Sequence, residues 1–310
     1  MTEPNKMQIW LAQTRANFLL LAVVLTFIGF SLSIIDITHA NLNLNIFHLI
    51  LLLVGNVLAH TSVNLFNEYS DYKTKIDFNT IRNPFSGGSG MLVSGATKPE
   101  TVLKVAIITM LIALIIGIYF IIIAHWFLTI LIVISALTIL LYTPFLAKIL
   151  LGEFFAGMTL GSFVVIGTYI GLVASPEMEL SQILPVKVIL ISIPVGILTS
   201  LLLFLNEFPD AEADKEGGRY HLVIALGKKR AAYLYCIGIF LVYGFILIIP
   251  ILSLSSYFLY LGFLTLPLAI KSCSTAVKYG DQTDKIIPAM GINVLVVLIT
   301  DLLIGIGNLL

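Results

Sequence analysis

The chain has 310 residues, of which 59% are hydrophobic and 11% charged, and its formal net charge at pH 7 is zero. Its mean hydropathy of +1.05 is far above that of soluble domains, in which about half of the residues are apolar. This composition excludes a soluble globular protein, and the lack of a basic stripe gives no sign of a nucleic-acid partner. The polar start "MTEPNKMQIWLAQTR" also lacks the features of a cleaved signal peptide, so none is expected.

Apolar runs of about 17–25 residues, each long enough to cross a bilayer as a helix, predict an all-α integral membrane protein with about nine spans. In chain order, the spans are expected at 15–36, 44–66, 101–124, 126–146, 150–174, 187–206, 229–252, 255–271 and 286–308.

Lysine and arginine residues gather at the span ends that an odd-even count places on one side of the membrane, and only Lys187 lies opposite. Because cytoplasmic loops carry the excess of basic residues, that side is predicted to be cytoplasmic. The short N-terminal segment 1–14 and the loops 67–98 and 207–228 would then face the cytoplasm. With nine spans, the C-terminus would lie outside.

An acidic motif occurs twice at the ends of apolar runs. "NEYSDYKTKID" follows the second predicted span and "NEFPDAEADK" follows the sixth, so Asn-Glu-x-x-Asp is repeated. A single cluster of this kind is most simply explained as solvated loop charge, but its recurrence on the same side favours a functional site. The repeat indicates one domain over 1–310, built as two four-helix halves plus a ninth helix, with the site where the halves meet.

The spacing of the polar residues indicates how they are presented. Asn206, Asp210 and Asp214 recur every four residues, which places them on one face of a continuing helix. His60, Asn64, Asn67 and Asp71 likewise share one helical face. Asp77 follows Asp71 by six residues and does not fit that face, so the helix must unwind between them if both serve one site.

Closely packed carboxylates repel one another unless a cation compensates their charge. A donor set of Asn and Asp oxygens, with no His or Cys pattern, suits the hard cation Mg²⁺, which often bridges carboxylates to substrate phosphates. Two such sets facing each other across a cavity predict a clamp for a diphosphate. The two cysteines, Cys236 and Cys273, have no metal-ligand spacing and are expected to be packing residues.

Over essentially its whole length the chain resembles the UbiA superfamily of intramembrane prenyltransferases. "NLFNEYSDYKTKID" and "NEFPDAEADKEGGRYHLVIALG" are similar to the two aspartate-rich motifs of its dihydroxynaphthoate branch, which serves menaquinone synthesis. Lys75 departs from the hydroxybenzoate type of first motif, which has aspartate there. In the second motif, Arg219 stands where the branch usually has lysine and His221 where it has threonine, so the charge is kept and the hydroxyl is lost.

The resemblance implies that a polyprenyl diphosphate loses its diphosphate, and that an aromatic acceptor, expected to be 1,4-dihydroxy-2-naphthoate, captures the allylic cation. Two Mg²⁺ ions would bridge the diphosphate. The implied metal ligands are Asn67, Asp71, Asp77, Asn206, Asp210 and Asp214, with His60 and Asn64 behind them. The implied diphosphate-binding residues are Arg15, Lys75, Arg82, Lys148 and Arg219. Asp71, Asp210, Tyr142 and Lys148 are the expected catalytic residues.

Two further segments have open roles. Tyr142 and Phe145 in "LLYTPFLAK" could hold the allylic cation against an aromatic face, or belong to the interfacial belt. The glycine-rich segment 82–95 is either a lid that excludes water or a plain connector. Glycines four residues apart, at 157/161 and 167/171, indicate close helix contacts rather than a groove for the prenyl tail.

Alternatives remain at this stage. A prenyltransferase for another acceptor, such as a hydroxybenzoate or a phenazine, fits the same motifs. A secondary transporter would also have repeats and intramembrane carboxylates, but its site is expected near the midplane rather than at one face. Asp301, in the last predicted span, is assigned a structural role. Prenyl chain length and oligomeric state are not determined by the sequence.

Overall fold

The structure is a computed structural model that describes residues 5–39 and 43–310. Within these ranges every regular element is a helix, and eight helical segments are long and apolar enough to cross a membrane. They are α2 (Ala16–His39), α3 (Ile46–Lys73), α5 (Pro99–Ile123), α7–η2–α8 (Gly152–Val173), α10 (Val186–Glu216), α12 (Lys228–Ile251), η3–α13 (Tyr257–Tyr279) and α14 (Thr283–Leu309).

A ninth apolar helix, α6 (Leu128–Leu141), is shorter than the other spans. It ends at Leu141, before the predicted boundary at 146, and Pro144, which has no N–H group and disfavours a helical residue before it, stands three residues further on. Together these helices confirm the predicted all-α membrane fold of about nine helices. The other elements are α1 (Lys6–Gln13), α4 (Ile76–Asn79), η1 (Leu146–Lys148), α7 (Gly152–Gly157), η2 (Met158–Ser162), α8 (Phe163–Val173), α9 (Leu180–Ile183), α11 (Leu222–Leu226), η3 (Tyr257–Thr265) and α13 (Leu266–Tyr279).

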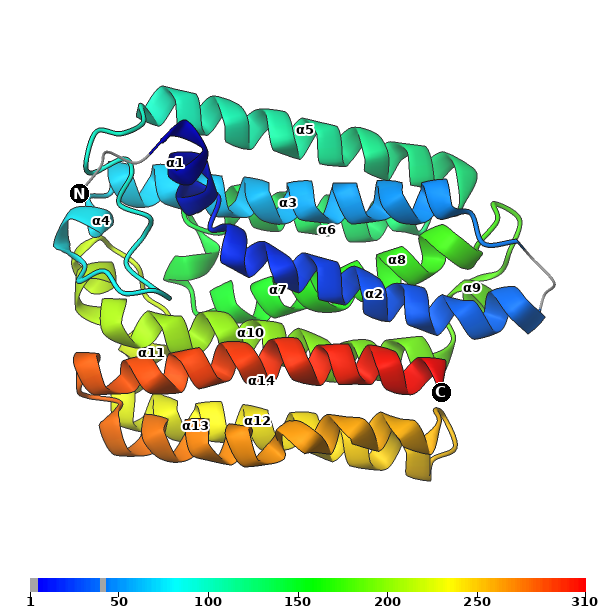
Figure 1. Cartoon of the computed structure of the whole chain (residues 1–310). Coiled ribbons are helices and arrows are strands. Elements are labelled where there is room, and N and C mark those ends of the chain that lie inside the picture. Colours follow the sequence, from blue (N-terminus) through cyan, green and yellow to red (C-terminus); the bar gives the residue numbers. More distant parts are fainter. Residues whose placement is uncertain (1–4, 40–42) are drawn as a thin grey trace.

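The long helices lie side by side in one bundle (Figure 1). α10 is central and packs against α7, η2, α12 and α14, while α2 packs against α8 and α14. The short elements α1, α4 and α11 lie at one end of the bundle, here named the motif end, and α9 and the C-terminus lie at the opposite end (Figure 1).

Two helices continue past the apolar runs that define them. α3 reaches Lys73 and α10 reaches Glu216, whereas the apolar runs end near 66 and 206. Each helix therefore carries its acidic motif on a full extra turn or more, beyond its membrane-spanning part. The start of each segment expected as a motif loop is helical, since α3 ends at Lys73 and α10 at Glu216.

Glycines join the fifth and sixth spans closely. A Cβ atom on Gly157 would come within 2.5 Å of the Gly196 carbonyl oxygen, and one on Gly161 within 2.9 Å of the Gly196 Cα atom. The helix is wound as a π-helix at Met158–Ser162, where it passes α10. The Gly157/Gly161 pair is thus a helix-packing contact of the small-xxx-small kind, as the spacing predicts.

Candidate active site

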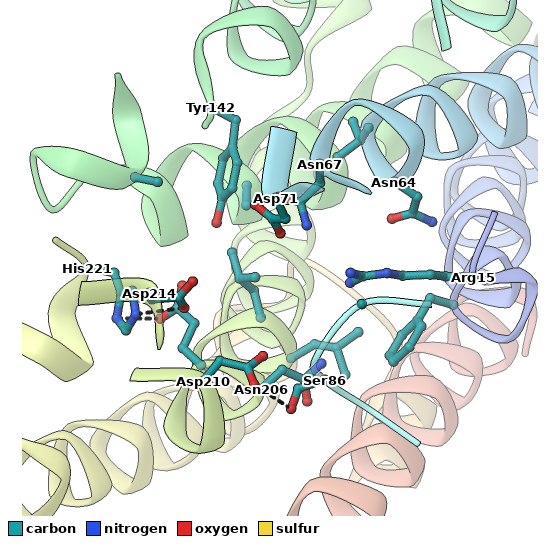
Figure 2. Close-up of a pocket in the computed structure, with 18 of the residues that line it drawn as sticks. Arg15, Asn64, Asn67, Asp71, Ser86, Tyr142, Asn206, Asp210, Asp214 and His221 are labelled. Atoms are coloured by element: carbon teal, nitrogen blue, oxygen red, sulfur yellow. Dashed lines mark hydrogen bonds and ion pairs between the residues drawn. The ribbon is translucent and has the colours of Figure 1, made fainter. Parts of the chain in front are cut away.

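A cavity lies at the motif end, between α2, α3, α6, α7 and α10 (Figure 2). Its walls are apolar toward the bundle interior and carry carboxylate, amide and guanidinium groups toward the motif end. The expected site residues that line it are Arg15, His60, Asn64, Asn67, Asp71, Asp77, Tyr142, Asn206, Asp210, Asp214 and Arg219. The two acidic motifs, about 140 residues apart in the sequence, therefore contribute to a single cavity.

The first motif is presented by a helix and the turn that ends it. α3 carries Asn67 and Asp71, and its end is followed by Lys75 in the left-handed region, with φ +64°. This turn reverses the chain into α4 and brings Asp77 into the cavity wall, where it is 3% exposed. The unwinding expected between Asp71 and Asp77 is present.

Asp77 lies in a buried and electronegative position. Burial, and then the negative charges of Asp71 and Glu68, raise the pKa of its carboxyl group to about 8. A metal ion bound beside Asp77 would relieve this, because an opposite charge favours the ionised carboxylate.

The second motif remains helical throughout. Asn206, Asp210 and Asp214 follow one face of α10 toward its end, as their four-residue spacing predicts. Asp210 Oδ2 accepts the backbone N–H of Gly87 at 2.9 Å, and its Oδ1 lies 3.4 Å from the Ser86 hydroxyl, which donates to it (Figure 2). The glycine-rich segment is thereby attached to the second motif.

The segment 82–95 is also attached to the first motif. The Ser89 backbone N–H donates to Glu68 Oε2 at 3.1 Å, and its hydroxyl donates to Glu68 Oε1. Gln13 of α1 donates to the same carboxylate at 3.3 Å. Because the segment contacts both motifs and contributes Ser86, Gly87 and Gly88 to the cavity lining, it forms a cover over the cavity.

Arg219 connects the two motifs directly. Its Nη2 atom donates to Asn67 Oδ1 at 2.8 Å and to Asp71, and its Nη1 atom donates to Asp214 Oδ1 at 2.9 Å. A planar guanidinium group suits this arrangement, because it can serve two carboxylates at once. The substitution of arginine for lysine at this position thus gives a bridge that one ammonium group would not reproduce in the same geometry.

Arg15 reaches the cavity from the other side. It sits in the left-handed region, with φ +51°, between α1 and α2. Asn64 Nδ2 donates to the Thr14 carbonyl oxygen at 2.9 Å and so attaches this junction to α3. Figure 2 shows the Arg15 side chain extending into the cavity.

The residues present fit Mg²⁺. The two motifs offer carboxylate and amide oxygens, the donors that this ion prefers. Asp77 Oδ2 and Asn206 Oδ1 are buried, and neither has a hydrogen-bond partner in the described part of the chain. Buried polar atoms without partners are rare, and a bound cation would account for both.

Three of the expected diphosphate-binding residues do not line the cavity formed by the described residues. Lys75, Arg82 and Lys148 are exposed. The left-handed turn places Lys75 outside, Arg82 donates to the Asp77 carbonyl oxygen at 3.3 Å, and Lys148 lies in the short helix η1. Phe145, the second aromatic candidate, is 53% exposed and is not among the residues that line the cavity.

Sequence reasoning missed a second group of polar residues beside the cavity. Glu153, Glu207 and His221 are all buried and lie together behind Asp214. Glu207 is part of the repeated Asn-Glu-x-x-Asp pattern, which is the only signal that could have indicated it. Glu153 has no local pattern, because only the packing of α7 against α10 brings it to the site.

A second, largely apolar cavity adjoins the first. It lies between α3, α5, α6 and the η2–α8 segment, and shares His60, Ile139 and Leu160 with the first cavity. Gly167 lines it, and a Cβ atom there would meet nothing within 4 Å among the described atoms. Of the second glycine pair, Gly167 and Gly171, only Gly171 is therefore a close packing contact, as expected, whereas Gly167 lines a cavity.

This fold and site define an integral membrane protein with two carboxylate motifs converging on one cavity at the end of a helical bundle. The UbiA prenyltransferase family matches residues 22–295, and the chain belongs to this family. The resemblance stated from the two motifs is thereby confirmed.

A named relative agrees with this assignment. A protein of Bacillus subtilis (strain 168) named 1,4-dihydroxy-2-naphthoate octaprenyltransferase is 28% identical over 215 residues, which cover 68% of this chain. The match spans 65% of that relative's length.

Solved structures share the fold. A UbiA homologue from Aeropyrum pernix K1 superposes with a TM-score of 0.68 at 15% identity, covering 94% of this chain and 96% of that one. A UbiA homologue from Archaeoglobus fulgidus bound to GPP and Mg²⁺ has a TM-score of 0.54 at 13% identity, covering 96% and 99%.

Proposed function

We propose that this chain transfers a polyprenyl group from a polyprenyl diphosphate to an aromatic acceptor, 1,4-dihydroxy-2-naphthoate, in the synthesis of a respiratory quinone. The observation that carries the proposal is the convergence of both acidic motifs on one cavity with two arginines. Family membership and the naphthoate octaprenyltransferase relative support it. A clamp of this kind suits the ionisation of a diphosphate ester, in which the departing group gains negative charge.

Six oxygen-donating residues are proposed to hold two Mg²⁺ ions, which supply charge neutralisation at the leaving diphosphate. They are Asn67, Asp71, Asp77, Asn206, Asp210 and Asp214. The Archaeoglobus fulgidus homologue bound to GPP and Mg²⁺ supports this assignment. Arg219 pairs with one oxygen of Asp71 and one of Asp214, so it competes with a bound ion for the oxygens of these carboxylates.

The arginines of the cavity are proposed to bind the diphosphate. Arg15 already extends into the cavity, and Arg219 becomes available to phosphate oxygens once its carboxylate partners bind metal. A guanidinium group can contact phosphate oxygens through two parallel N–H bonds. The exposed positions of Lys75, Arg82 and Lys148 make them weaker candidates for this role.

The reaction then needs a place for an allylic cation. The carbon–oxygen bond to the diphosphate breaks, and both electrons leave with the diphosphate. Tyr142 lines the cavity and offers the π-face that attracts a cation without reacting with it. The cover formed by 82–95 would keep water from quenching the cation.

The acceptor carbon supplies the electrons for the new bond. In 1,4-dihydroxy-2-naphthoate the carbon that bears the carboxylate attacks the cation. The bond to the carboxylate then breaks, CO₂ leaves, and the electron pair of that bond restores the aromatic ring. No proton has to be removed from this carbon. The apolar second cavity is proposed to receive the prenyl tail.

Product analysis tests the acceptor. Purified protein would be incubated with Mg²⁺, a long-chain polyprenyl diphosphate and either 1,4-dihydroxy-2-naphthoate or 4-hydroxybenzoate. Prenylated naphthoquinol with release of CO₂ is the expected result. Turnover with hydroxybenzoate and none with the naphthoate would remove the proposed acceptor while leaving prenyl transfer in place. Consumption of the diphosphate without any membrane gradient distinguishes the enzyme from a transporter.

A further inference from the structure

Three buried ionisable side chains meet beside the cavity, outside the set of Mg²⁺ ligands proposed above. Glu153 lies in α7, Glu207 in α10, and His221 directly before α11. Their exposed fractions are 2%, 7% and 2%. Two carboxyl groups buried this closely are unfavourable unless a cation or a shared proton compensates them.

Each of these side chains has one buried polar atom without a hydrogen-bond partner among the described residues, and the three side chains lie close together. Glu153 Oε2, Glu207 Oε2 and His221 Nδ1 each lack a hydrogen-bond partner anywhere in residues 5–39 and 43–310. One ligand atom from each residue lies within 4.8 Å of the others, and His221 Nδ1 is 3.4 Å from Glu207 Oε2. Buried polar atoms without partners are rare, and one cation held between these three side chains would compensate all of them.

The opposite atoms of two of these side chains are already fixed. His221 Nε2 lies 3.2 Å from Asp214 Oδ2, to which it donates when Nδ1 is left as the free acceptor (Figure 2). Glu153 Oε1 accepts the backbone N–H of Leu222 at 2.8 Å. Metal-bound histidines typically donate their other ring N–H to a carboxylate, and metal-bound carboxylates are themselves hydrogen-bonded. His221 and Glu153 thus already make the hydrogen bonds that would orient them as metal ligands.

Distances and donor type indicate the class of ion. In a tetrahedral site with bonds of about 2.0–2.2 Å, ligand atoms lie roughly 3.4 Å apart, which is the separation of His221 Nδ1 and Glu207 Oε2. An imidazole nitrogen with two carboxylate oxygens suits a divalent transition-metal ion, whereas Mg²⁺ prefers oxygen alone. We propose that Glu153, Glu207 and His221 bind a divalent transition-metal ion of the Zn²⁺ class, separate from the Mg²⁺ sites.

The proposed site has an open side. Glu207 and His221 line the cavity, whereas Glu153 lies behind them. Three protein ligands leave a fourth tetrahedral position, which here faces the cavity and could take water or an oxygen of a bound molecule. Asp214 joins this site to the second motif, because its Oδ2 atom contacts His221 and its Oδ1 atom contacts Arg219.

Cobalt substitution tests the site without measuring turnover. The full-length protein in detergent is treated with EDTA, freed of chelator and titrated with Co²⁺ in the presence of saturating Mg²⁺. A low-coordinate site with a histidine ligand gives strong visible d–d absorption, whereas six oxygen ligands give only weak bands. A saturable strong spectrum, displaced by Zn²⁺, is the expected result.

Variants assign the spectrum to the cluster. Glu153→Gln, Glu207→Gln and His221→Asn should each abolish it, and Asp214→Asn should weaken Co²⁺ binding by about 10–100-fold through the outer contact. The matched control is His60→Asn, which removes another buried histidine of the same cavity whose Nε2 atom has no partner among the described residues. Its spectrum should equal that of the wild type.

The outcomes separate this site from the Mg²⁺ clamp. Asp71→Asn should lose prenyl transfer and keep the Co²⁺ spectrum, so failure of the proposed function leaves the spectral result unaffected. A wild-type protein without the strong spectrum overturns the proposal, and this holds even if a cluster variant fails to fold. A spectrum that survives in folded Glu207→Gln and His221→Asn, or that is lost in His60→Asn, overturns it as well.

Discussion

Gly87 donates its backbone N–H to Asp210 Oδ2 at 2.9 Å, although 123 residues separate them in the chain. The donor lies in the glycine-rich cover and the acceptor in the second acidic motif. The strength of this bond depends on the charge of Asp210, because an ionised carboxylate is a better hydrogen-bond acceptor than a neutral one. The cover is therefore part of the site, and substitutions of its glycines can test this.

Gly88→Ala should disturb Asp77. Gly88 has φ +71°, and a Cβ atom there would collide with the Asp77 carboxylate. Prenyl transfer is expected to fall by about 100-fold, the effect of misplacing a reacting group by about 1 Å. The matched control is Gly95→Ala, which carries the same strain at φ +75° but meets nothing within 4 Å among the described atoms. Equal losses in the two variants would show that backbone strain alone is responsible.

Asp71→Asn and Asp210→Asn should each reduce turnover by about 100- to 1,000-fold, because each removes a carboxylate proposed to hold the Mg²⁺ ions that neutralise the leaving diphosphate. EDTA should abolish the activity of the wild type, and Mg²⁺ should restore it. Glu212→Gln is the control, since Glu212 lies on the same helix as Asp210 and its side chain is 76% exposed. Near-normal turnover in either aspartate variant at normal expression would remove that residue from the metal site.

Arg219→Gln should destabilise the ion-free protein more than the Mg²⁺-bound protein. The variant leaves Asp71 and Asp214 buried without their common cation, and breaking such a buried ion pair costs about 3–5 kcal/mol. Saturating Mg²⁺ should recover most of the loss in Tm, since an ion that binds only the folded state stabilises it. The measurement is Tm in detergent with EDTA or Mg²⁺. The same loss under both conditions would contradict the metal assignment of these carboxylates.

Tyr142→Leu should lower the rate constant of prenyl transfer, whereas Tyr142→Phe should keep most of it. The ring rather than the hydroxyl is expected to stabilise the cation, and a desolvated cation–π contact contributes about 2 kcal/mol, or roughly 30-fold in rate. Single-turnover kinetics would separate this effect from binding. A variant with phenylalanine that is as slow as the leucine variant would assign the role to the hydroxyl.

Cysteine labelling tests the predicted orientation. Ser94 and Lys215 are exposed near the motif end, and Glu177 is exposed in the turn that follows α8 toward the other end. On a background without Cys236 and Cys273, Ser94→Cys and Lys215→Cys should react only from the cytoplasmic side, and Glu177→Cys only from outside. Labelling of Ser94→Cys and Lys215→Cys from opposite sides would separate the two motifs and exclude a single site.

The spacing of polar residues in the sequence was enough to predict which of them share a helical face. The four-residue steps predicted the shared faces of α3 and α10, and the six-residue step to Asp77 predicted the break after Asp71. These features depend on residues close in the chain, where helical geometry alone decides which side chains lie together.

Contacts between distant segments could not be predicted in this way. Nothing in the local sequence places Arg219 between Asp71 and Asp214 rather than on a phosphate, or brings Glu153 beside Glu207. Lys148 was wrongly predicted to face the site, because a basic residue next to an apolar run need not turn toward the interior. Lys148 lies in the short helix η1, beyond the end of α6, and is exposed.

The close glycine contact between the α7–η2 segment and α10 leaves no room for larger side chains between these helices. Gly157 and Gly161 pack against the backbone of Gly196, and the nearest side chains beside this contact are the small ones of serine and threonine. The apolar cavity lies between α3, α5, α6 and the η2–α8 segment, where long side chains of α5 and α6 form part of the wall and Gly167 leaves room. If the prenyl tail enters this cavity as proposed, the side chains of α5 and α6 are among those that limit its length. Substitutions along those two helices should tune the length of the product, whereas substitutions at the glycines should damage the fold.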